Sequence, residues 1–196
     1  MKYSEYKYLV LSDLYRIAGN VDASTLARQL LVGEAFKYNF WMRTCLYAKK
    51  HIVLKYMIFP LARFKLRSLS YKFGISIPYD TSIDSGFYIG HFGGIVVNRR
   101  CIVGKNCNIS HGVTLGQANR GANKGYPLLG DNVYIGPGAK IIGGISIGNN
   151  VAIGANCVVT KDVPDNSVIV GVPGRVVSQT GSAGYVNNTD YDECIG

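Results

Sequence analysis

Aliphatic residues recur every six positions through the C-terminal two thirds of the chain. From residue 129 onward, each is followed four residues later by a small or β-branched residue, with glycine and asparagine frequent between them. The aliphatic series comprises Leu129, Ile135, Ile141, Ile147, Ile153 and Val159, preceded by Val97, Val103, Ile109 and Leu115 and, further upstream, by Ile77, Ile83, Ile89 and Ile95. A six-residue period is too short for a helical hairpin and predicts short parallel strands joined by tight corners.

Three such units form one 18-residue coil of a triangular prism, with the aliphatic side chains inside. The predicted fold is therefore mainly β, a parallel β-helix of hexapeptide repeats over residues 74–178. Cys101, Cys107 and Cys157 occupy small-residue positions of the repeat, so we interpret them as core residues rather than nucleophiles. Residues 179–196 are rich in glycine and asparagine and are predicted to form a flexible tail, unless they cover the groove of a neighbouring chain.

Residues 1–73 follow a different pattern, in which apolar residues are spaced by three or four. This spacing predicts an N-terminal α-helical region over residues 1–73. That region holds 13 Lys and Arg against 4 Asp and Glu, whereas residues 74–196 hold 8 of each. The net charge of +9 therefore belongs to the helices.

Residues 43–72 combine this basic charge with aromatic side chains. One interpretation is a solvated helical surface, and another is peripheral contact with anionic lipid. No nucleic-acid-binding motif is present, so nucleic acid ranks last as a partner. The five cysteines lack metal-ligand spacing, and no signal peptide or membrane-spanning run is visible. This favours reduced thiols in the cytoplasm, with or without contact with the inner face of the membrane.

The repeat is interrupted twice. Its phase slips by two residues near Ile95–Val97, and 14 residues separate Leu115 from Leu129 where six would suffice. The surplus of about eight residues predicts a polar, glycine-rich loop over residues 117–127. Loops extruded from a regular scaffold often carry binding groups.

Two of the three histidines occupy equivalent positions. His91 and His111 are each the third residue of their unit and lie 20 residues apart, which is one coil plus the two-residue slip. We therefore expect the two imidazoles at one corner of the prism, stacked one coil above the other, with the loop close by. This arrangement favours an active site; the alternative is that each histidine only satisfies a corner carbonyl. A metal site is not expected, because no third histidine or convergent carboxylate spacing is evident.

Several segments resemble the serine acetyltransferase group of hexapeptide acyltransferases. They are residues 89–97 (IGHFGGIVV), 109–116 (ISHGVTLG), 135–141 (IGPGAKI), 158–164 (VVTKDVP) and 171–175 (GVPGR). The resemblance implies a left-handed parallel β-helix, a homotrimer, acetyl-CoA as donor and a site in the groove between adjacent prisms. It also implies that His91 is the general base, that Lys161 and Arg175 contact the coenzyme A phosphates, and that Gly136, Ala139, Gly154 and Ala155 line the pantetheine slot.

The sequence departs from that family at positions that concern the acceptor. The family has one aspartate upstream of the catalytic histidine, another directly before it and an Arg-His pair in the loop; here these positions hold Ser76, Gly90 and Gly125-Tyr126. A buried free amino acid needs ionic partners. We therefore expect a neutral acceptor, a sugar hydroxyl, as in the capsular and colanic-acid polysaccharide O-acetyltransferases that the loop and basic helices also resemble.

The resulting hypothesis is an acetyl-CoA-dependent O-acetyltransferase of a surface-polysaccharide glycan. In it Asn119, Arg120 and Tyr126 contact the acceptor, and His111 shares the role of base or binds the acceptor. Candidates for the residue that orients His91 are Asp84, Asp190 and Asp192. Two alternatives remain open, a serine O-acetyltransferase of cysteine biosynthesis and a non-catalytic β-helix scaffold.

Overall fold

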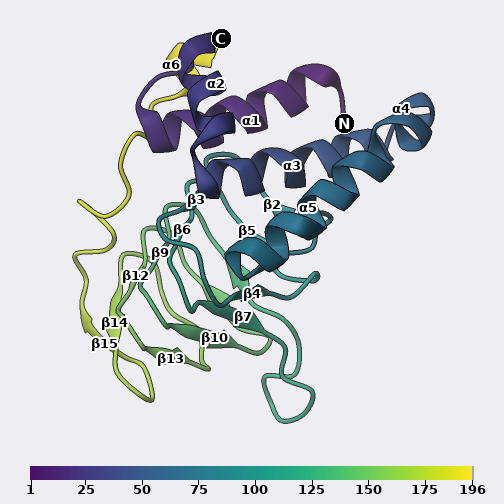
Figure 1. Ribbon diagram of the computed structural model, residues 1–196. Coiled ribbons are helices and arrows are strands. Elements are labelled where there is room, and N and C mark those ends of the chain that lie inside the picture. The colour runs from purple at the N-terminus through teal and green to yellow at the C-terminus, as the bar shows by residue number, and fades with distance from the viewer. Residues whose placement is uncertain (196) are drawn as a thin grey trace.

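The computed structural model describes residues 1–195 and places a layer of helices on one end of a β-helix (Figure 1). The helices of the N-terminal layer are α1 (Tyr3–Ala18), α2 (Ala23–Leu31), α3 (Glu34–Lys49), α4 (Ile52–Met57) and α5 (Phe59–Phe73). Gly74 ends α5 in the left-handed conformation, with φ of 61°, and the first strand follows at once. Within residues 1–195, no helix is both long and apolar enough to cross a membrane.

The strands of the β-helix form three sheets, one on each face of the prism. The first sheet contains β1 (Ile75–Ser76), β4 (Ile95–Val97), β7 (Thr114–Gly116), β10 (Lys140–Ile142) and β13 (Val158–Val159). The second contains β2 (Ser82–Ile83), β5 (Ile102–Val103), β8 (Leu128–Leu129) and β11 (Ser146–Ile147). The third contains β3 (Tyr88–Ile89), β6 (Asn108–Ile109), β9 (Tyr134–Ile135), β12 (Ala152–Ile153), β14 (Val168–Val170) and, antiparallel at its end, β15 (Arg175–Ser178).

The predicted left-handed β-helix with N-terminal helices is confirmed, and so is its core. All the aliphatic positions of the six-residue series are buried, from Ile77 to Val159. Cys101, Cys107 and Cys157 are fully buried, as predicted. Burial raises the pKa of the Cys107 thiol to about 12 and that of Cys101 to about 11, so both remain protonated thiols at neutral pH.

The two-residue slip lies in the corner that joins β3 to β4. Ile89 pairs with Ile109 before this corner, and Val96 pairs with Thr114 after it, so the surplus falls between these two pairs. The Phe92 ring, in the middle of the corner, lies 5.1 Å from the ring of Phe73 at the end of α5. The longer corner therefore contacts the helical layer.

A different corner, between the second and third sheets, is built from asparagines in the left-handed conformation. Asn106, Asn132, Asn150 and Asn166 have φ between 54° and 59°, a region that asparagine and glycine adopt most readily. Their side chains form a ladder with N–O distances of 2.9, 3.0 and 3.1 Å. Each rung replaces hydrogen bonds to water and fixes the corner of one coil against the next.

A buried ion pair joins the helices to the first coil. The Arg43 guanidinium on α3 donates to both carboxylate oxygens of Asp13 on α1, at 3.0 and 3.1 Å. It also donates to the carbonyls of Ile83 and Asp84, each at 2.6 Å, and Asp13 accepts the Phe87 amide at 2.8 Å. These contacts fix α1 and α3 relative to the corner between β2 and β3.

The extruded loop lies between β7 and β8 and projects from the lower edge of the prism (Figure 1). Strand pairing across it joins Val103 to Leu129, whereas in the next coil Leu129 pairs with Ile147. The interval from Val103 to Leu129 is longer than that from Leu129 to Ile147 by the surplus of about eight residues that the sequence predicts. The predicted loop is therefore confirmed. Ala118 and Gly125 close the base of the loop with a pair of backbone hydrogen bonds of 3.1 Å.

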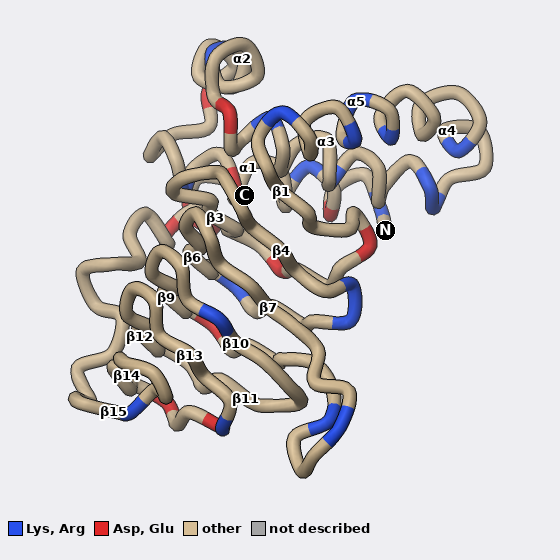
Figure 2. Tube along the Cα trace, turned by 60° about the horizontal axis from the view of Figure 1, so that its bottom comes forward, with Lys and Arg blue, Asp and Glu red and all other residues tan. Residues whose placement is uncertain are grey.

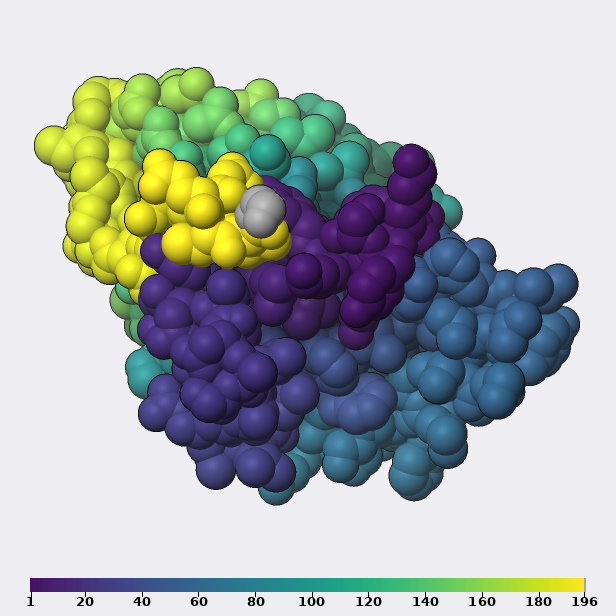
Figure 3. Space-filling view, turned by 90° about the horizontal axis from the view of Figure 1, so that it is seen from above, coloured from purple at the N-terminus to yellow at the C-terminus, as the bar shows by residue number. Residues whose placement is uncertain are grey.

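The C-terminal segment packs against the rest of the molecule, which its composition did not predict. Tyr191 is 2% exposed, and its hydroxyl group bonds to Ser85 at 3.0 Å and to Asn106 at 2.9 Å. The Tyr8 hydroxyl donates to Asp192 at 2.6 Å, at the start of α6 (Asp192–Ile195). Seen from above, this segment lies beside the N-terminal helices (Figure 3). Tertiary contacts, and not local propensity, hold it in place.

Candidate active site

His91 and His111 lie at the corner that joins the third sheet to the first. The register of β3 with β6 places them one coil apart, their ring centroids are 6.1 Å apart and the rings meet edge to face at 69°. Both side chains are exposed. The predicted stacking of the two imidazoles is confirmed, and their catalytic role stays a prediction.

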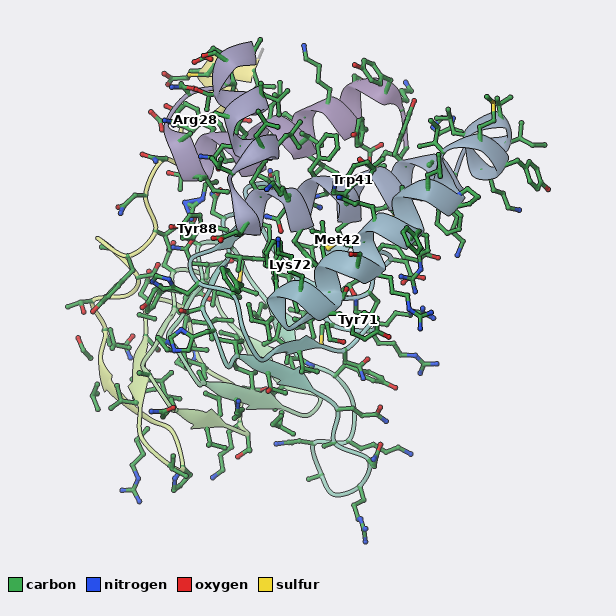
Figure 4. All side chains as sticks on the ribbon, in the orientation of Figure 1. Arg28, Trp41, Met42, Tyr71, Lys72 and Tyr88 are labelled. Carbon is green, nitrogen blue, oxygen red and sulfur yellow. The ribbon has the colours of Figure 1, made fainter. Side chains whose placement is uncertain are left out.

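A pocket of about 320 Å³ opens beside His91 and extends under the helical layer. Its lining includes Tyr88, Gly90, His91 and Phe92 of the first coil and, from the helical layer, Gln29 of α2 and Glu34 at the start of α3. Figure 4 shows Tyr88 where the helices meet the first coil. The volume falls at the lower end of the range for small-molecule sites, roughly 300–1,000 Å³. His91 and Glu34 thus line one small pocket.

Sequence reasoning missed Glu34 and Gln29. Glu34 is the first residue of α3 and follows the N-cap residue Gly33, so locally it is an ordinary acidic residue at a helix start. It lies far before His91 in the sequence, and only the packing of α3 on the first coil brings it to the pocket. The single available signal was its isolation, because it is the last acidic residue before Asp80.

The carboxylates proposed to orient His91 lie elsewhere. The Asp84 carboxylate accepts the amide of Ser85 at 2.7 Å, and Asp192 accepts the hydroxyl of Tyr8. Neither these two nor Asp190 lines the His91 pocket, and Ser76 lies in a separate groove below α5. The only hydrogen bond from a side chain to either ring among residues 1–195 is between Ser110 Oγ and His111 Nδ1, at 3.4 Å.

The loop residues Asn119, Arg120 and Tyr126 lie at another corner of the prism, between the first and second sheets. The Arg100 guanidinium donates to the Tyr126 hydroxyl at 3.2 Å, and Arg100 belongs to that same corner. We expected this loop to lie beside the two histidines of the same chain, and that expectation is wrong. The short separation from His111 in the sequence corresponds to one full face of the prism.

The predicted pantetheine residues continue the column of the two histidines. The strand register places Pro137 and Ala155 below His111, flanked by Gly136 and Gly154. A Cβ on Gly136 would lie 2.9 Å from the Ala155 nitrogen, so coil stacking alone requires this glycine. The prediction that Ala139 lines the pantetheine slot is wrong, because this residue is 0% exposed and faces the core.

Lys161 and Arg175 both line one pocket of about 370 Å³ at the C-terminal end of the prism. At about 4.8 Å per coil, the His91–Ala155 column spans roughly 14 Å. The amides of Gly112 and Gly138 already donate to the carbonyls of Gly93 and His111, so neither is free to bind an oxyanion. No group of three or more metal-ligating side chains is found within residues 1–195.

The hexapeptide repeats of this β-helix define a hexapeptide-repeat transferase, and residues 126–161 match the family described as bacterial transferase hexapeptide (six repeats). A crystal structure of serine acetyltransferase from Brucella abortus superposes with a TM-score of 0.74 and 29% identity, covering 91% of this chain and 71% of that one. Neisseria gonorrhoeae serine acetyltransferase in complex with serine gives 0.69 and 31%, covering 90% and 70%.

The serine acetyltransferase of Staphylococcus xylosus is 42% identical over 136 residues, which cover 69% of this chain and 60% of that protein. The one from Synechococcus elongatus is 44% identical over 108 residues, which cover 55% and 44%. The chain belongs to the serine acetyltransferase family. It spans 44% to 60% of the length of these two relatives.

The expectation of a surface-polysaccharide sugar as acceptor is wrong. Relatives at 39–44% identity are named serine acetyltransferase, and so are the matching structures. The resemblance to capsular and colanic-acid acetyltransferases is likewise not supported. The prediction considered only the three positions at which the family's charged residues are missing here, whereas Glu34 of the helical layer lines the same pocket as His91.

Proposed function

We propose that this protein transfers an acetyl group from acetyl-CoA to the hydroxyl group of serine. The observation that carries the proposal is the pocket that His91 and Glu34 both line, in a chain of the serine acetyltransferase family. The carboxylate offers an ionic partner for the ammonium group of an amino acid. The imidazole offers a base for its hydroxyl group.

In the proposed reaction His91 accepts the hydroxyl proton as the serine oxygen attacks the thioester carbonyl. The C–S bond breaks when the tetrahedral adduct collapses, and the thiolate of coenzyme A takes the proton back from the imidazolium. His111, 6.1 Å away between ring centroids, is positioned to contact the acceptor or to assist this proton transfer. The products are O-acetylserine and coenzyme A.

The donor is proposed to lie along the column of small residues below the histidines. Gly136, Gly154 and Ala155 leave room for a pantetheine arm, and Lys161 and Arg175 supply positive charge for phosphates at the end of the prism. This direction places the thioester near His91.

We infer further that the active unit is a homotrimer. The loop with Asn119, Arg120 and Tyr126 occupies a different corner from the histidines, so in one chain it cannot contact an acceptor in the His91 pocket. A neighbouring prism whose loop corner faces the histidine corner would complete each site. Mixing inactive His91→Ala protein with inactive Tyr126→Ala protein should then restore part of the activity, whereas sites contained in one chain would give none.

The proposal is tested by measuring release of coenzyme A from acetyl-CoA with L-serine as acceptor. His91→Ala should lower kcat by about 10²–10⁴-fold, the usual contribution of a general base. Glu34→Gln should raise KM for serine by roughly tenfold to a hundredfold, because it removes one charged hydrogen bond. Glu193→Gln, an exposed glutamate in α6, is the matched control and should change neither constant.

A second acceptor tests the role of Glu34 directly. Glycerate carries the hydroxyl and carboxylate groups of serine without its ammonium group, so wild-type protein should prefer serine, and Glu34→Gln should lose much of that preference. Absence of coenzyme A release with serine would refute the proposal. A non-catalytic scaffold predicts that His91→Ala leaves the biological function intact.

A further inference from the structure

Helix α4 and the first half of α5 form a hairpin that projects from the body of the protein (Figures 1 and 3). No residue of α4 is buried, and the hairpin carries a concentration of exposed large apolar side chains. We call these residues the hairpin surface: Ile52 (78% exposed), Val53 (63%), Tyr56 (73%), Met57 (66%), Leu61 (70%) and Phe64 (76%). Isolated exposed apolar residues are common, but a contiguous group of this size marks an interaction site.

Helix α5 has two apolar stripes. One comprises Ala62, Leu66, Leu69 and Phe73, which are buried against the core. The other comprises Leu61, Phe64 and Tyr71, all at least 70% exposed. At about 100° per residue, the exposed stripe lies roughly opposite the buried one. Folding of one chain therefore leaves it uncovered, and Figure 4 shows Tyr71 on the outer side of α5.

Cations flank the exposed stripe of α5 on both sides. By the same helical spacing, Arg63 and Arg67 lie along one edge and Lys65 and Lys72 along the other. Between residues 35 and 79 the chain has nine Lys and Arg and no Asp or Glu, and Figure 2 shows blue without red along α4 and α5. An apolar stripe bordered by cations is the pattern of a helix that lies in the interface of an anionic membrane.

We propose that the hairpin surface binds the anionic headgroup region of a lipid bilayer, with Leu61 and Phe64 inserted and the flanking cations on lipid phosphates. Charge distinguishes this partner from a second copy of the chain. In a two-fold contact the same cations would face each other, and the hairpin has no carboxylate to pair with them. Anionic lipid supplies the opposite charge and an apolar layer at the same place.

The test is co-sedimentation of the full chain with phosphatidylcholine vesicles, with and without phosphatidylserine. Binding should require phosphatidylserine and weaken with salt, because each cation near an anionic surface strengthens binding about fivefold. Leu61→Ser with Phe64→Ser should abolish binding. Val176→Ser with Val177→Ser, at residues 42% and 61% exposed on β15, is the matched control and should leave binding unchanged.

The charge contribution is tested by Arg63→Glu with Arg67→Glu, which should reduce binding at least tenfold, against Lys105→Glu with Lys124→Glu, which should not. A reporter variant that does not depend on loss of binding is Phe64→Trp combined with Trp41→Phe, since Trp41 is the sole tryptophan. Its emission should shift to the blue with phosphatidylserine vesicles only.

Two results would overturn the proposal. One is absence of vesicle binding by wild-type protein at low salt. The other is a change of oligomeric mass in the Leu61→Ser, Phe64→Ser protein, measured by sedimentation, together with unchanged vesicle binding; the hairpin surface would then join copies of the chain. Circular dichroism of each variant checks that the fold is retained.

Discussion

Removal of Arg43 should destabilise the protein far more than removal of a surface arginine in a similar ion pair. The guanidinium and carboxylate side chains of the Arg43–Asp13 pair are 3% and 1% exposed. Arg43→Ala leaves the Asp13 carboxylate buried without its cation and removes the donor to the Ile83 and Asp84 carbonyls. Breaking a buried pair in this way costs about 3–5 kcal/mol.

The Arg99–Asp80 pair is the control, because its N–O distance is also 3.0 Å while its side chains are 64% and 28% exposed. Exposed pairs contribute about 0–1 kcal/mol. In a chain of this length, a loss of about 3–5 kcal/mol corresponds to a fall in Tm of roughly 6–20 °C, against a few degrees at most for Arg99→Ala. Urea unfolding followed by circular dichroism measures both differences.

The stability of the Arg43→Ala variant should depend on pH. Burial raises the pKa of the Asp13 carboxyl, and Arg43 opposes that rise. Without Arg43 the pKa of Asp13 in the folded protein rises further above its value in the unfolded protein. At a pH between these two values, the folded protein therefore binds a proton that the unfolded protein has lost. The variant should therefore recover part of its lost stability as the pH falls. Arg43→Ala combined with Asp13→Asn should also be more stable than Arg43→Ala alone.

Equal losses for Arg43→Ala and Arg99→Ala would refute the reasoning. So would a double variant whose loss is the sum of the two single losses, because the cost is assigned to one uncompensated charge.

Three further predictions concern the prism and the C-terminal segment. Ile141→Ala, at a fully buried position between Leu115 and Val159, should cost about 2–5 kcal/mol in urea unfolding, whereas Val177→Ala should change stability by less than about 0.5 kcal/mol. Gly104→Ala should lower Tm, because its Cβ would lie 2.4 Å from Asp131 Oδ1 and 2.5 Å from the Gly130 carbonyl, an overlap that costs about 1–3 kcal/mol. Tyr191→Phe removes the hydroxyl bonded to Ser85 and Asn106; it should speed limited proteolysis within residues 179–195, and an unchanged cleavage rate would show that those bonds do not hold the segment.

Different kinds of sequence information predicted the different parts of the candidate site. His91 over His111 follows from counting residues in coils, because strand pairing converts a sequence interval directly into a spatial step. Lys161 and Arg175, which share a pocket, came from the family resemblance and not from the period. Ala139 was misassigned because a repeat position shared with small residues does not say which way the side chain faces.

The amino-acid sequence by itself determined the prism, its inward residues and the stacked histidines. Each depends on a six-residue period that every coil enforces on the next through backbone pairing. The tertiary structure alone decided that Glu34 lines the pocket beside His91 and that the loop with Tyr126 occupies another corner. The first depends on how α3 packs on the first coil, through contacts such as those of Arg43 with the carbonyls of Ile83 and Asp84. The second depends on which face of the prism separates two residues that are close in the chain.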